Sequence, residues 1–374
     1  MSSASESTNI LPIGYRFKHY QIKKLLGHGG FGITYLASDL RLNKLVAIKE
    51  YFPHDFAIRE KNIIQPKTEK DHQAFSWGKQ RFKAEAQILS QFHHPNIVQV
   101  LEFFELNGSG YIVMAYESGQ SLVDALNDGE TATYTELKIL APPLLDGLAT
   151  IHQANLLHRD IKPANIYLRD KDNSPVLLDF GSARYDVSSH SRPVTSIVSR
   201  GYAPYEQYTS DGSQQGAWTD IYAMAGVFYT VMTGQVPVDA PTRVGAINNN
   251  KPDVLKPVSE LCKDSFPEKF LNGIDWALEV LEPDRPQDVA SWTEALLSGS
   301  LSNQYHAAQQ AKTGQNRRAG AETGKSDIPV IISNTYSQQI DKVDAKAPYH
   351  QASVVVLASL IFIFTSVLAW LLLT

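Results

Sequence analysis

The 374-residue sequence is poor in cysteine, and its positive and negative charges nearly balance. The single cysteine, Cys262, excludes an intrachain disulfide, so the folded part suits a reducing compartment. Lys and Arg total 34 against 39 Asp and Glu, which gives a net charge of −5. Because nucleic-acid-binding proteins carry a basic footprint, we expect no nucleic-acid partner.

Other familiar features are also missing. The first residues have neither a basic start nor an apolar run, which predicts no signal peptide. The 11 histidines and the cysteine show no zinc-site spacing, and no internal repeat is visible. With 43% hydrophobic and 20% charged residues, the composition is that of a globular protein and excludes collagen-like, coiled-coil and wholly disordered chains.

One long hydrophobic run is present near the C-terminus. Residues 352–373 contain no charge, no glycine and no proline. As a helix, this stretch would be about 33 Å long, close to the roughly 30 Å thickness of the bilayer hydrocarbon. The run therefore predicts a single transmembrane helix. The alternative is a buried core helix, but core helices are usually shorter and amphipathic.

The flanks of this run indicate its orientation. Lys342, Lys346 and His350 precede it, although Asp341 and Asp344 weaken the bias. Basic residues on the near side favour an N-terminal part that stays in the cytoplasm. The stronger argument is that about 350 residues without an export signal would otherwise have to cross the membrane. We expect a single-pass protein that contacts membrane lipid.

Composition divides the rest of the chain. We expect an N-terminal tail at residues 1–19, a folded domain at 20–297 and a flexible linker at 298–351 that is rich in small and polar residues. Periodicity within the domain predicts strands first and helices afterwards, which indicates an α+β fold. The expected strands are 20–26, 33–38, 45–50, 97–104 and 110–115, and the expected helices are 79–91, 134–153, 220–233, 267–281 and 288–296.

A glycine-rich segment lies between the first two expected strands. Residues 27–32 read GHGGFG, which fits G-x-G-x-x-G. Glycines there let backbone N–H groups approach phosphate oxygens without interference from a Cβ atom. The motif alone is weak, and a strand rather than a helix follows it, which argues against a dinucleotide-binding fold. A plain hairpin turn remains the alternative.

Lys49 ends an otherwise apolar strand. A lysine in that place needs an anionic partner, either phosphate oxygens or a carboxylate on a nearby helix. Glu85, on the expected helix 79–91, is the candidate carboxylate. The alternatives are a surface lysine at a strand end and a glutamate on a solvated helix face.

A more specific pattern follows in the second half of the domain. Residues 158–165 read HRDIKPAN, and Asp179 opens the tripeptide DFG directly after an apolar strand. Phosphoryl transfer needs an aligned hydroxyl, compensation of the charge on the γ-phosphate and a bound metal ion. Asp160, Lys162, Asn165 and Asp179 supply the side-chain types for these tasks. Chance occurrence of both patterns at this spacing would be rare.

Together these motifs resemble the protein kinase family, in its bacterial serine/threonine form, over residues 20–297. The resemblance implies a two-lobed fold with a β-rich N-lobe and an α-helical C-lobe, followed by the single C-terminal transmembrane helix. It implies that Asp160 orients the substrate hydroxyl, that Lys162 reaches the γ-phosphate, and that Lys49 binds the α- and β-phosphates and pairs with Glu85. Lysine at position 162 is typical of serine/threonine kinases.

The same resemblance implies the cofactors, ATP and Mg²⁺, with Mn²⁺ as an alternative metal. The metal would be held by Asn165 and Asp179. Tyr167 stands where a smaller aliphatic residue often lies under adenine, so its hydroxyl needs a partner. The implied contacts of ATP are Gly27, His28, Gly29, Gly30, Phe31, Gly32, Ile33, Ala47, Lys49, Met114, Ala115, Tyr116, Glu117 and Tyr167.

Further residues downstream extend the resemblance. Glu206 in the sequence APYE is expected to form a buried ion pair with Arg285, and the helix that begins at Asp220 is expected to brace the catalytic loop. Residues 51–77 form a longer connection than is usual in the family, which puts the Lys49–Glu85 pair in doubt. Because APYE contains one more residue than the family's Ala-Pro-Glu motif, the family's preference for substrate peptides cannot be transferred to this chain.

The segment between the DFG tripeptide and Gly201 is rich in serine. We expect autophosphorylation at Thr195 or Ser196, with the phosphate paired to Arg159. The alternative is a serine-rich loop that carries no regulatory phosphate.

Three functions compete on these observations. The first is an active serine/threonine protein kinase with protein substrates, anchored on the cytoplasmic side of a bacterial inner membrane. The helix would anchor the chain, or it would mediate association of chains within the bilayer, for example as a homodimer. The second is a catalytically silent kinase-fold scaffold at the membrane, although silent members usually lack one of the residues found here. The third is a small-molecule kinase.

Overall fold

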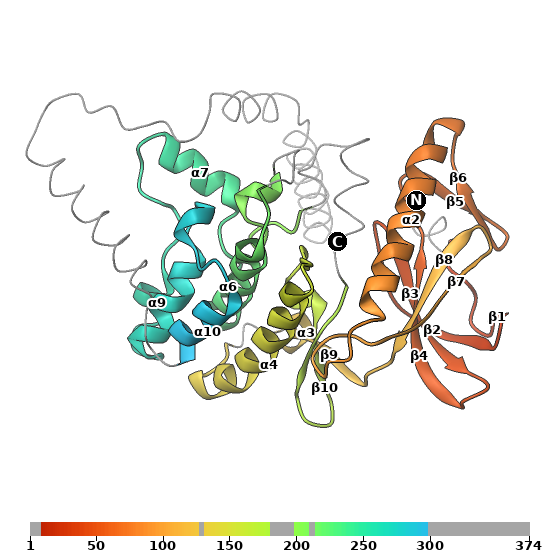
Figure 1. The fold of residues 1–374 in the computed structure, drawn as a ribbon, viewed down its shortest axis with the longest axis horizontal. Helices are drawn as coiled ribbons and strands as arrows, with labels where there is room; N and C mark the ends of the chain where they lie inside the picture. The colour runs from red at the N-terminus through yellow and green to blue at the C-terminus, as the bar shows by residue number, and fades with distance from the viewer. Residues whose placement is uncertain (1–8, 127–130, 180–197, 209–213, 298–374) are drawn as a thin grey trace, which may run out of the picture. The chain divides into compact units, whose positions relative to one another are not determined.

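The computed structural model describes residues 9–126, 131–179, 198–208 and 214–297 of the chain. Its N-terminal part is built on a six-stranded antiparallel sheet with the strand order β1-β2-β3-β4-β8-β7 (Figure 1). The sheet confirms four of the five expected strands. The bounds of its strands are β1 (Arg16–Phe17), β2 (Tyr20–Gly29), β3 (Gly32–Asp39), β4 (Lys44–Tyr51), β7 (Val100–Leu106) and β8 (Ser109–Ala115).

The fifth expected strand begins later than predicted. Residues 97–104 were expected to be extended, whereas β7 starts at Val100. Ile97 instead forms a parallel bridge with Leu177, and the amide of Val98 donates to the carbonyl of Leu177 at 3.0 Å. These residues therefore link the N-terminal sheet to a strand that lies 80 positions later in the sequence (97 to 177).

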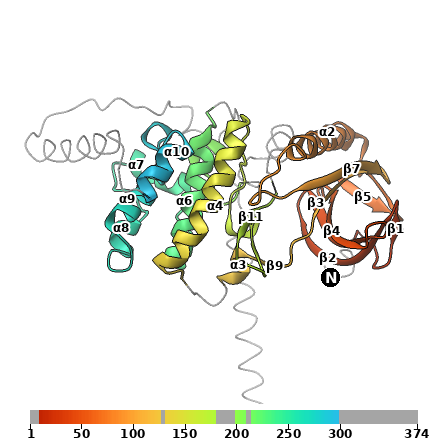
Figure 2. The same ribbon diagram turned by 60° about the horizontal axis from the view of Figure 1, so that its bottom comes forward.

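The long connection after β4 is ordered. It forms a two-stranded hairpin, β5 (Ala57–Glu60) and β6 (Ile63–Pro66), followed by α2 (His72–Leu89). Helix α2 therefore starts seven residues before the expected helix, because Phe75 and Gly78 continue the buried face that Phe82 and Leu89 define. The helix packs against β7 and β8 (Figures 1 and 2).

The expected N-terminal tail differs from the structure between residues 9 and 19. Residues Arg16–Phe17 form β1, which pairs with the start of β2. Leu11 is 2% exposed, and its amide donates to the hydroxyl of Tyr35 at 3.1 Å. Residues 9–19 therefore pack with the sheet rather than forming a separate tail, since burial of an apolar side chain ties this segment to it.

The C-terminal part is helical. Its longest helix, α4, begins where Thr133 and Glu136 form a capping box and matches the expected helix 134–153. In α6, every residue from Thr219 to Met232 is buried, which marks it as the central helix. The helices are α3 (Leu122–Ala125), α4 (Tyr134–Gln153), α6 (Ala217–Thr233), α7 (Ala240–Asn248), α8 (Val258–Leu261), α9 (Glu268–Ala277) and α10 (Val289–Leu297).

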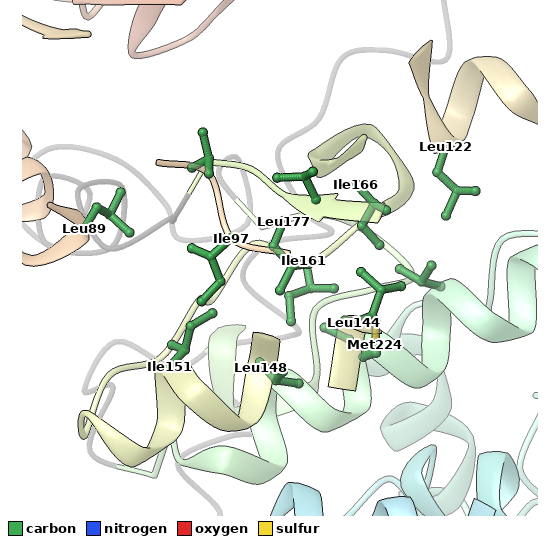
Figure 3. Packing of buried hydrophobic residues seen from close by; sticks show 14 of the residues in the cluster. Leu89, Ile97, Leu122, Leu144, Leu148, Ile151, Ile161, Ile166, Leu177 and Met224 are labelled. Carbon is green, nitrogen blue, oxygen red and sulfur yellow. The ribbon is translucent and has the colours of Figure 1, made fainter. Parts of the chain in front are cut away.

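A three-stranded sheet lies between α4 and the N-terminal part. Its order is β11 (Pro175–Leu177), β10 (Ile166–Arg169) and β9 (Gly119–Ser121). Figure 3 shows the apolar packing beneath it, where Ile161 and Leu177 meet Leu144 and Leu148 of α4. This packing fixes the loop between α4 and β10, which carries the HRDIKPAN sequence.

Cys262 follows α8 and is buried, with 9% of its surface exposed. Within the described residues, no helix combines the length and the apolar character that a bilayer crossing requires. The predicted transmembrane helix 352–373, the linker 298–351 and the predicted phosphorylation sites Thr195 and Ser196 lie outside the described residues.

Candidate active site

The loop that carries Asp160 is held by a carboxylate from α6. Asp220 is fully buried and accepts hydrogen bonds from the amides of His158 and Arg159, both at 2.8 Å. His152 of α4 contacts the same carboxylate through Nε2 at 2.8 Å. Burial alone would raise the pKa of Asp220, but the hydrogen bonds from His152 and from the amide of Arg159 lower it, so the carboxylate stays ionised. The expectation that this helix braces the loop is confirmed.

His158 supports the loop from beneath. Its ring is fully buried, and Nε2 lies 2.9 Å from the carbonyl oxygen of Leu178. Because a carbonyl only accepts, Nε2 carries the proton in this contact. Burial lowers the pKa of His158, so the ring is neutral at physiological pH. This bond joins the catalytic loop to the residue before Asp179.

Lys162, Asn165 and Ser199 donate hydrogen bonds to the carboxylate of Asp160, which is 6% exposed. Lys162 Nζ lies 3.1 Å from Oδ1 and 3.0 Å from Oδ2. Asn165 donates from Nδ2 to Oδ2 at 2.9 Å and to the carbonyl of Asp160 at 2.7 Å. The hydroxyl of Ser199 donates to Oδ1 at 2.7 Å. The carboxylate is thus held by a lysine, an amide and a hydroxyl, which fix its orientation.

Ser199 is a site residue that the sequence reasoning missed. Its oxygen also accepts from Lys162 Nζ at 3.1 Å, so it bridges the lysine and the aspartate. The sequence placed it only among several hydroxyls of a serine-rich segment. The signal that could have identified Ser199 was its position seven residues before Glu206, since the sequence predicts that Glu206 is fixed by an ion pair with Arg285.

The predicted anchor of Glu206 is confirmed. Arg285 donates from Nη1 to Oε1 at 2.7 Å and from Nη2 to Oε2 at 3.3 Å, and both side chains are buried. Thr219 of α6 donates to the same carboxylate at 2.9 Å. This cluster fixes η4 (Tyr205–Tyr208) and, through the short stretch before it, the position of Ser199.

Lys49 of β4 lies against the DFG tripeptide. Its Nζ forms an ion pair with Oδ1 of Asp179 at 2.7 Å, which joins residues 130 positions apart. Asp179 follows β11 in a left-handed backbone conformation, with φ at 45°. Glu85 lies on the buried face of α2 and is 5% exposed. Its pairing with Lys49 stays a prediction.

The glycine-rich segment is the turn between β2 and β3. His28 pairs with Ile33 and Gly29 with Gly32, so Gly30 and Phe31 form the tip. A Cβ atom on Gly32 would lie 2.7 Å from the carbonyl oxygen of Glu50 in β4, which no side chain tolerates. Glycine at this position therefore allows the close packing of β3 on β4.

The residues expected around adenine lie on β4, β8 and β10 and on the segment after β8. Met114 and Ala115 end β8, and Ala47 of β4 pairs with Met114. Tyr167 of β10 donates its hydroxyl to the carbonyl of Gly119 at 2.6 Å, which is the partner that its position required. Burial raises the pKa of Tyr167, so the hydroxyl stays protonated.

The segment after β8 is held by a charged contact. Glu117 forms an ion pair with Arg169, with Nε 3.0 Å from Oε2, and accepts a hydrogen bond from Nη2 of Arg169 at 3.1 Å. The same Nη2 also donates to the carbonyl of Pro95 at 2.7 Å. These contacts tie the connection between the two parts of the domain to β10. Tyr116, the remaining expected contact, precedes Glu117 and is partly buried.

Asn165 and Asp179 fit a magnesium ion by donor type, since carboxylate and amide oxygens are the ligands that Mg²⁺ accepts in proteins. The side-chain nitrogen Nδ2 of Asn165 donates to Asp160, which fixes the orientation of the side chain. The side-chain oxygen Oδ1 of Asn165 takes no part in this hydrogen bond. Among the described residues, no group of three or more His, Cys, Asp or Glu side chains forms an all-protein metal site. A site with two protein ligands is typical of Mg²⁺ that also binds phosphates.

Comparison with known proteins agrees with this geometry. Residues 20–297 match the family model of the protein kinase domain. The serine/threonine-protein kinase pkn2 of Myxococcus xanthus is 28% identical over 284 residues, which are 74% of this chain and 32% of pkn2. PknB of Mycolicibacterium smegmatis is 30% identical over 338 residues, 86% of this chain and 50% of PknB. The chain thus spans a third to a half of these curated relatives.

A solved structure matches over the same region. The apo form of PpkA-294 is 36% identical, with a TM-score of 0.70, and the match covers 77% of this chain and 99% of that chain. The kinase domain of PknI from Mycobacterium tuberculosis shares the fold at 23% identity, with a TM-score of 0.56, and the match covers 77% of this chain and 98% of that chain. Since the family model covers most of the chain, the chain belongs to the protein kinase family.

Proposed function

We propose that the chain is a serine/threonine protein kinase, which transfers the γ-phosphate of ATP to serine or threonine hydroxyls of proteins. The observation that carries this proposal is the environment of Asp160. Its carboxylate accepts from the Ser199 hydroxyl at 2.7 Å, with Lys162 Nζ 3.0 Å away. A carboxylate that holds one hydroxyl in this way is suited to orient a second hydroxyl for attack on a phosphoryl group.

Different residues of the chain carry out different parts of the proposed reaction. Asp160 accepts the proton of the attacking hydroxyl. Lys162, next to that carboxylate, places a positive charge where charge develops on the transferred phosphoryl group. Lys49 is to bind the α- and β-phosphates, and for this it must exchange its contact with Asp179 for phosphate oxygens. The glycine-rich turn covers the phosphates through its backbone N–H groups.

The proposed metal ion is Mg²⁺, with Mn²⁺ as an alternative. Asn165 and Asp179 would hold it, and when bound it neutralises charge on the phosphate oxygens. The fixed amide of Asn165 supports this assignment.

The test compares the full chain with its Asp160→Asn variant in the presence of Mg·ATP. We expect phosphoryl transfer to fall by about 10³-fold or more, within the range of acid–base contributions and positioning. Asp264→Asn, which changes an exposed carboxylate in the C-terminal part, is the matched control and should retain activity. Wild type no faster than Asp160→Asn would favour the silent scaffold.

Phosphorylation within the chain is part of the proposal. The expected acceptor is Thr195 or Ser196, and Arg159, whose backbone has φ at 66°, is the expected partner of the phosphate. Peptide mapping of the same reactions tests this point. Wild-type chains without label between residues 181 and 200 would end it.

The location of the kinase is also proposed. Residues 352–373 would form a single membrane-spanning helix, with the kinase domain on the cytoplasmic side of a bacterial inner membrane. The support is the uncharged run of 22 residues, which has the length of one span. Association of two chains through this helix is a further part of the proposal.

A further inference from the structure

The connection after β4 contacts the tip of the glycine-rich turn. We propose that residues 52–67, named here the strut, hold this turn over the phosphates of ATP, and that Arg59 is the positioning residue that fixes the strut. The inference rests on the proposed function, because it assigns the strut to the nucleotide site. It adds a residue that no motif of the sequence indicates.

Two backbone hydrogen bonds join the strut to the turn. The amide of Phe52 donates to the carbonyl of Phe31 at 3.0 Å, and the amide of His54 donates to the carbonyl of Gly30 at 3.1 Å. The rings of His28 and His54 also meet edge to face, with centroids 6.2 Å apart. Both tip residues of the turn are therefore bonded to the strut, so the turn cannot move without it.

Arg59 anchors the strut through a buried charge cluster. Its guanidinium pairs with Glu50 of β4, and the two residues are 6% and 0% exposed. Glu50 also accepts from the hydroxyl of Tyr35 in β3 at 3.0 Å and from the hydroxyl of Tyr111 in β8. One carboxylate thus binds the strut to three strands of the sheet.

Arg59 also acts on the contact with the turn. Its guanidinium lies over the ring of Phe52, 5.6 Å from the centroid, and Phe52 supplies the amide that reaches Phe31. On its other side, Nε donates to the carbonyl of Asn9 at 2.8 Å. Arg59 therefore connects the sheet, the N-terminal segment and the residue that holds the turn.

The far end of the strut is fixed as well. The amide of Ile64 donates to the carbonyl of Asn107 at 2.8 Å, in the turn between β7 and β8. Gly108 has φ at +76°, and a Cβ atom there would lie 2.2 Å from the carbonyl oxygen of Ile64. Lys67 Nζ donates to the carbonyl of His54 at 2.7 Å and closes the strut on itself.

The energetics favour a positioning role. A buried ion pair gains little stability over an apolar pair of similar shape, because desolvation offsets the attraction. What the pair does provide is a fixed geometry, since each charge has few alternative partners in the core. A turn that is already held in place gives up less conformational freedom when it binds phosphates.

The test measures binding of AMP-PNP with Mg²⁺, and of adenosine, to the full chain by calorimetry. Adenosine lacks the phosphates that the turn covers. In Arg59→Met we expect the affinity for AMP-PNP to fall about tenfold, and adenosine to bind within about twofold of wild type. Glu60→Gln, which changes an exposed residue of the same strand, is the matched control and should leave both affinities unchanged.

Arg59→Met leaves Glu50 without its cation, so the double variant Glu50→Gln, Arg59→Met removes both charges and guards against a failure to fold. It should show the same selective loss. If both ligands weaken equally, or neither does, the strut has only a structural role and the inference is wrong. If wild type binds no AMP-PNP, the proposed function falls and the inference with it.

A second pair of variants tests the backbone contact itself. His54→Pro removes the amide that reaches Gly30, whereas His54→Ala keeps it and removes only the ring. We expect AMP-PNP to bind His54→Pro about fivefold more weakly than His54→Ala, with adenosine affected equally little in both. Equal affinities of the two variants for AMP-PNP would contradict the contact's role.

Discussion

Asp160 and Ser199 show how closely single residues are arranged at this site. The hydroxyl of Ser199 lies 2.7 Å from the carboxylate of Asp160 and 3.1 Å from Nζ of Lys162. It therefore holds the two groups that the proposed reaction uses at a fixed separation. Ser199 is a positioning residue in this arrangement, since it acts through its neighbours.

Ser199→Ala should lower kcat for a protein substrate by about 10- to 100-fold, which corresponds to one hydrogen bond to a charged group. Ser199→Thr keeps the hydroxyl and should retain most of the activity. Steady-state kinetics on both variants check this, with KM for ATP expected to change little. Equal loss in the alanine and threonine variants would mean that the hydroxyl is not what matters.

His158 should make stability depend on pH. Burial lowers its pKa from the ordinary value of 6.5, so the unfolded chain takes up a proton more readily than the folded one. The stability that the buried, neutral His158 ring contributes is fully present above pH 6.5 and is lost as pH falls toward the folded-state pKa. Thermal unfolding at pH 7.5 and 5.5 should show a larger drop in wild type than in His158→Gln, by about 1 kcal/mol. Parallel drops in the two proteins would contradict this.

Among the helices and strands, the sequence predicted those whose caps and hydrophobic periodicity lie within their own residues. Helix α4 matches its expected range because Thr133 and Glu136 cap it and its buried face repeats regularly. The first three expected strands of the main sheet pair in chain order, whereas β4 pairs with β8 rather than with β7, the next expected strand. The β5–β6 hairpin was not predicted, because strands of four residues carry too little periodicity and its anchor, Arg59 with Glu50, is a tertiary contact.

The buried pair of Glu206 and Arg285 joins η4 to the segment after α9, and it is an element-scale contact that the sequence did predict. Glu206→Gln should destabilise the chain by about 3–5 kcal/mol, because Arg285 is left as a buried charge. Denaturant unfolding measures the change. The double variant Glu206→Gln, Arg285→Met should recover part of the loss, and a double variant no more stable than the single one would contradict the explanation.

Over the whole molecule, the motifs predicted which parts of the chain would meet but not how. The ion pair between Lys49 and Asp179 joins two segments that the motifs had singled out. Ser199 and the strut escaped prediction for a common reason. Their contacts involve common side chains and backbone carbonyls, which leave no recognisable spacing in a sequence.

The proposed anchor gives a prediction at this scale. Removing residues 352–374 should release the chain from bacterial membranes while phosphoryl transfer to an added protein substrate stays within about twofold of the full chain, because that segment supplies no site residue. Fractionation and activity assays on the same preparations measure both effects. A truncated chain that still sediments with membranes would contradict the anchor, and complete loss of activity would contradict the independence of the kinase domain.

The position of Cys262 has a practical consequence. It is the only cysteine of the sequence, it is buried behind α8, and burial raises the pKa of its thiol, so little reactive thiolate is present at neutral pH. A second cysteine introduced at an exposed position should therefore accept a maleimide dye selectively in the native protein. Fluorescent probes on the glycine-rich turn thus become available without first removing the natural thiol.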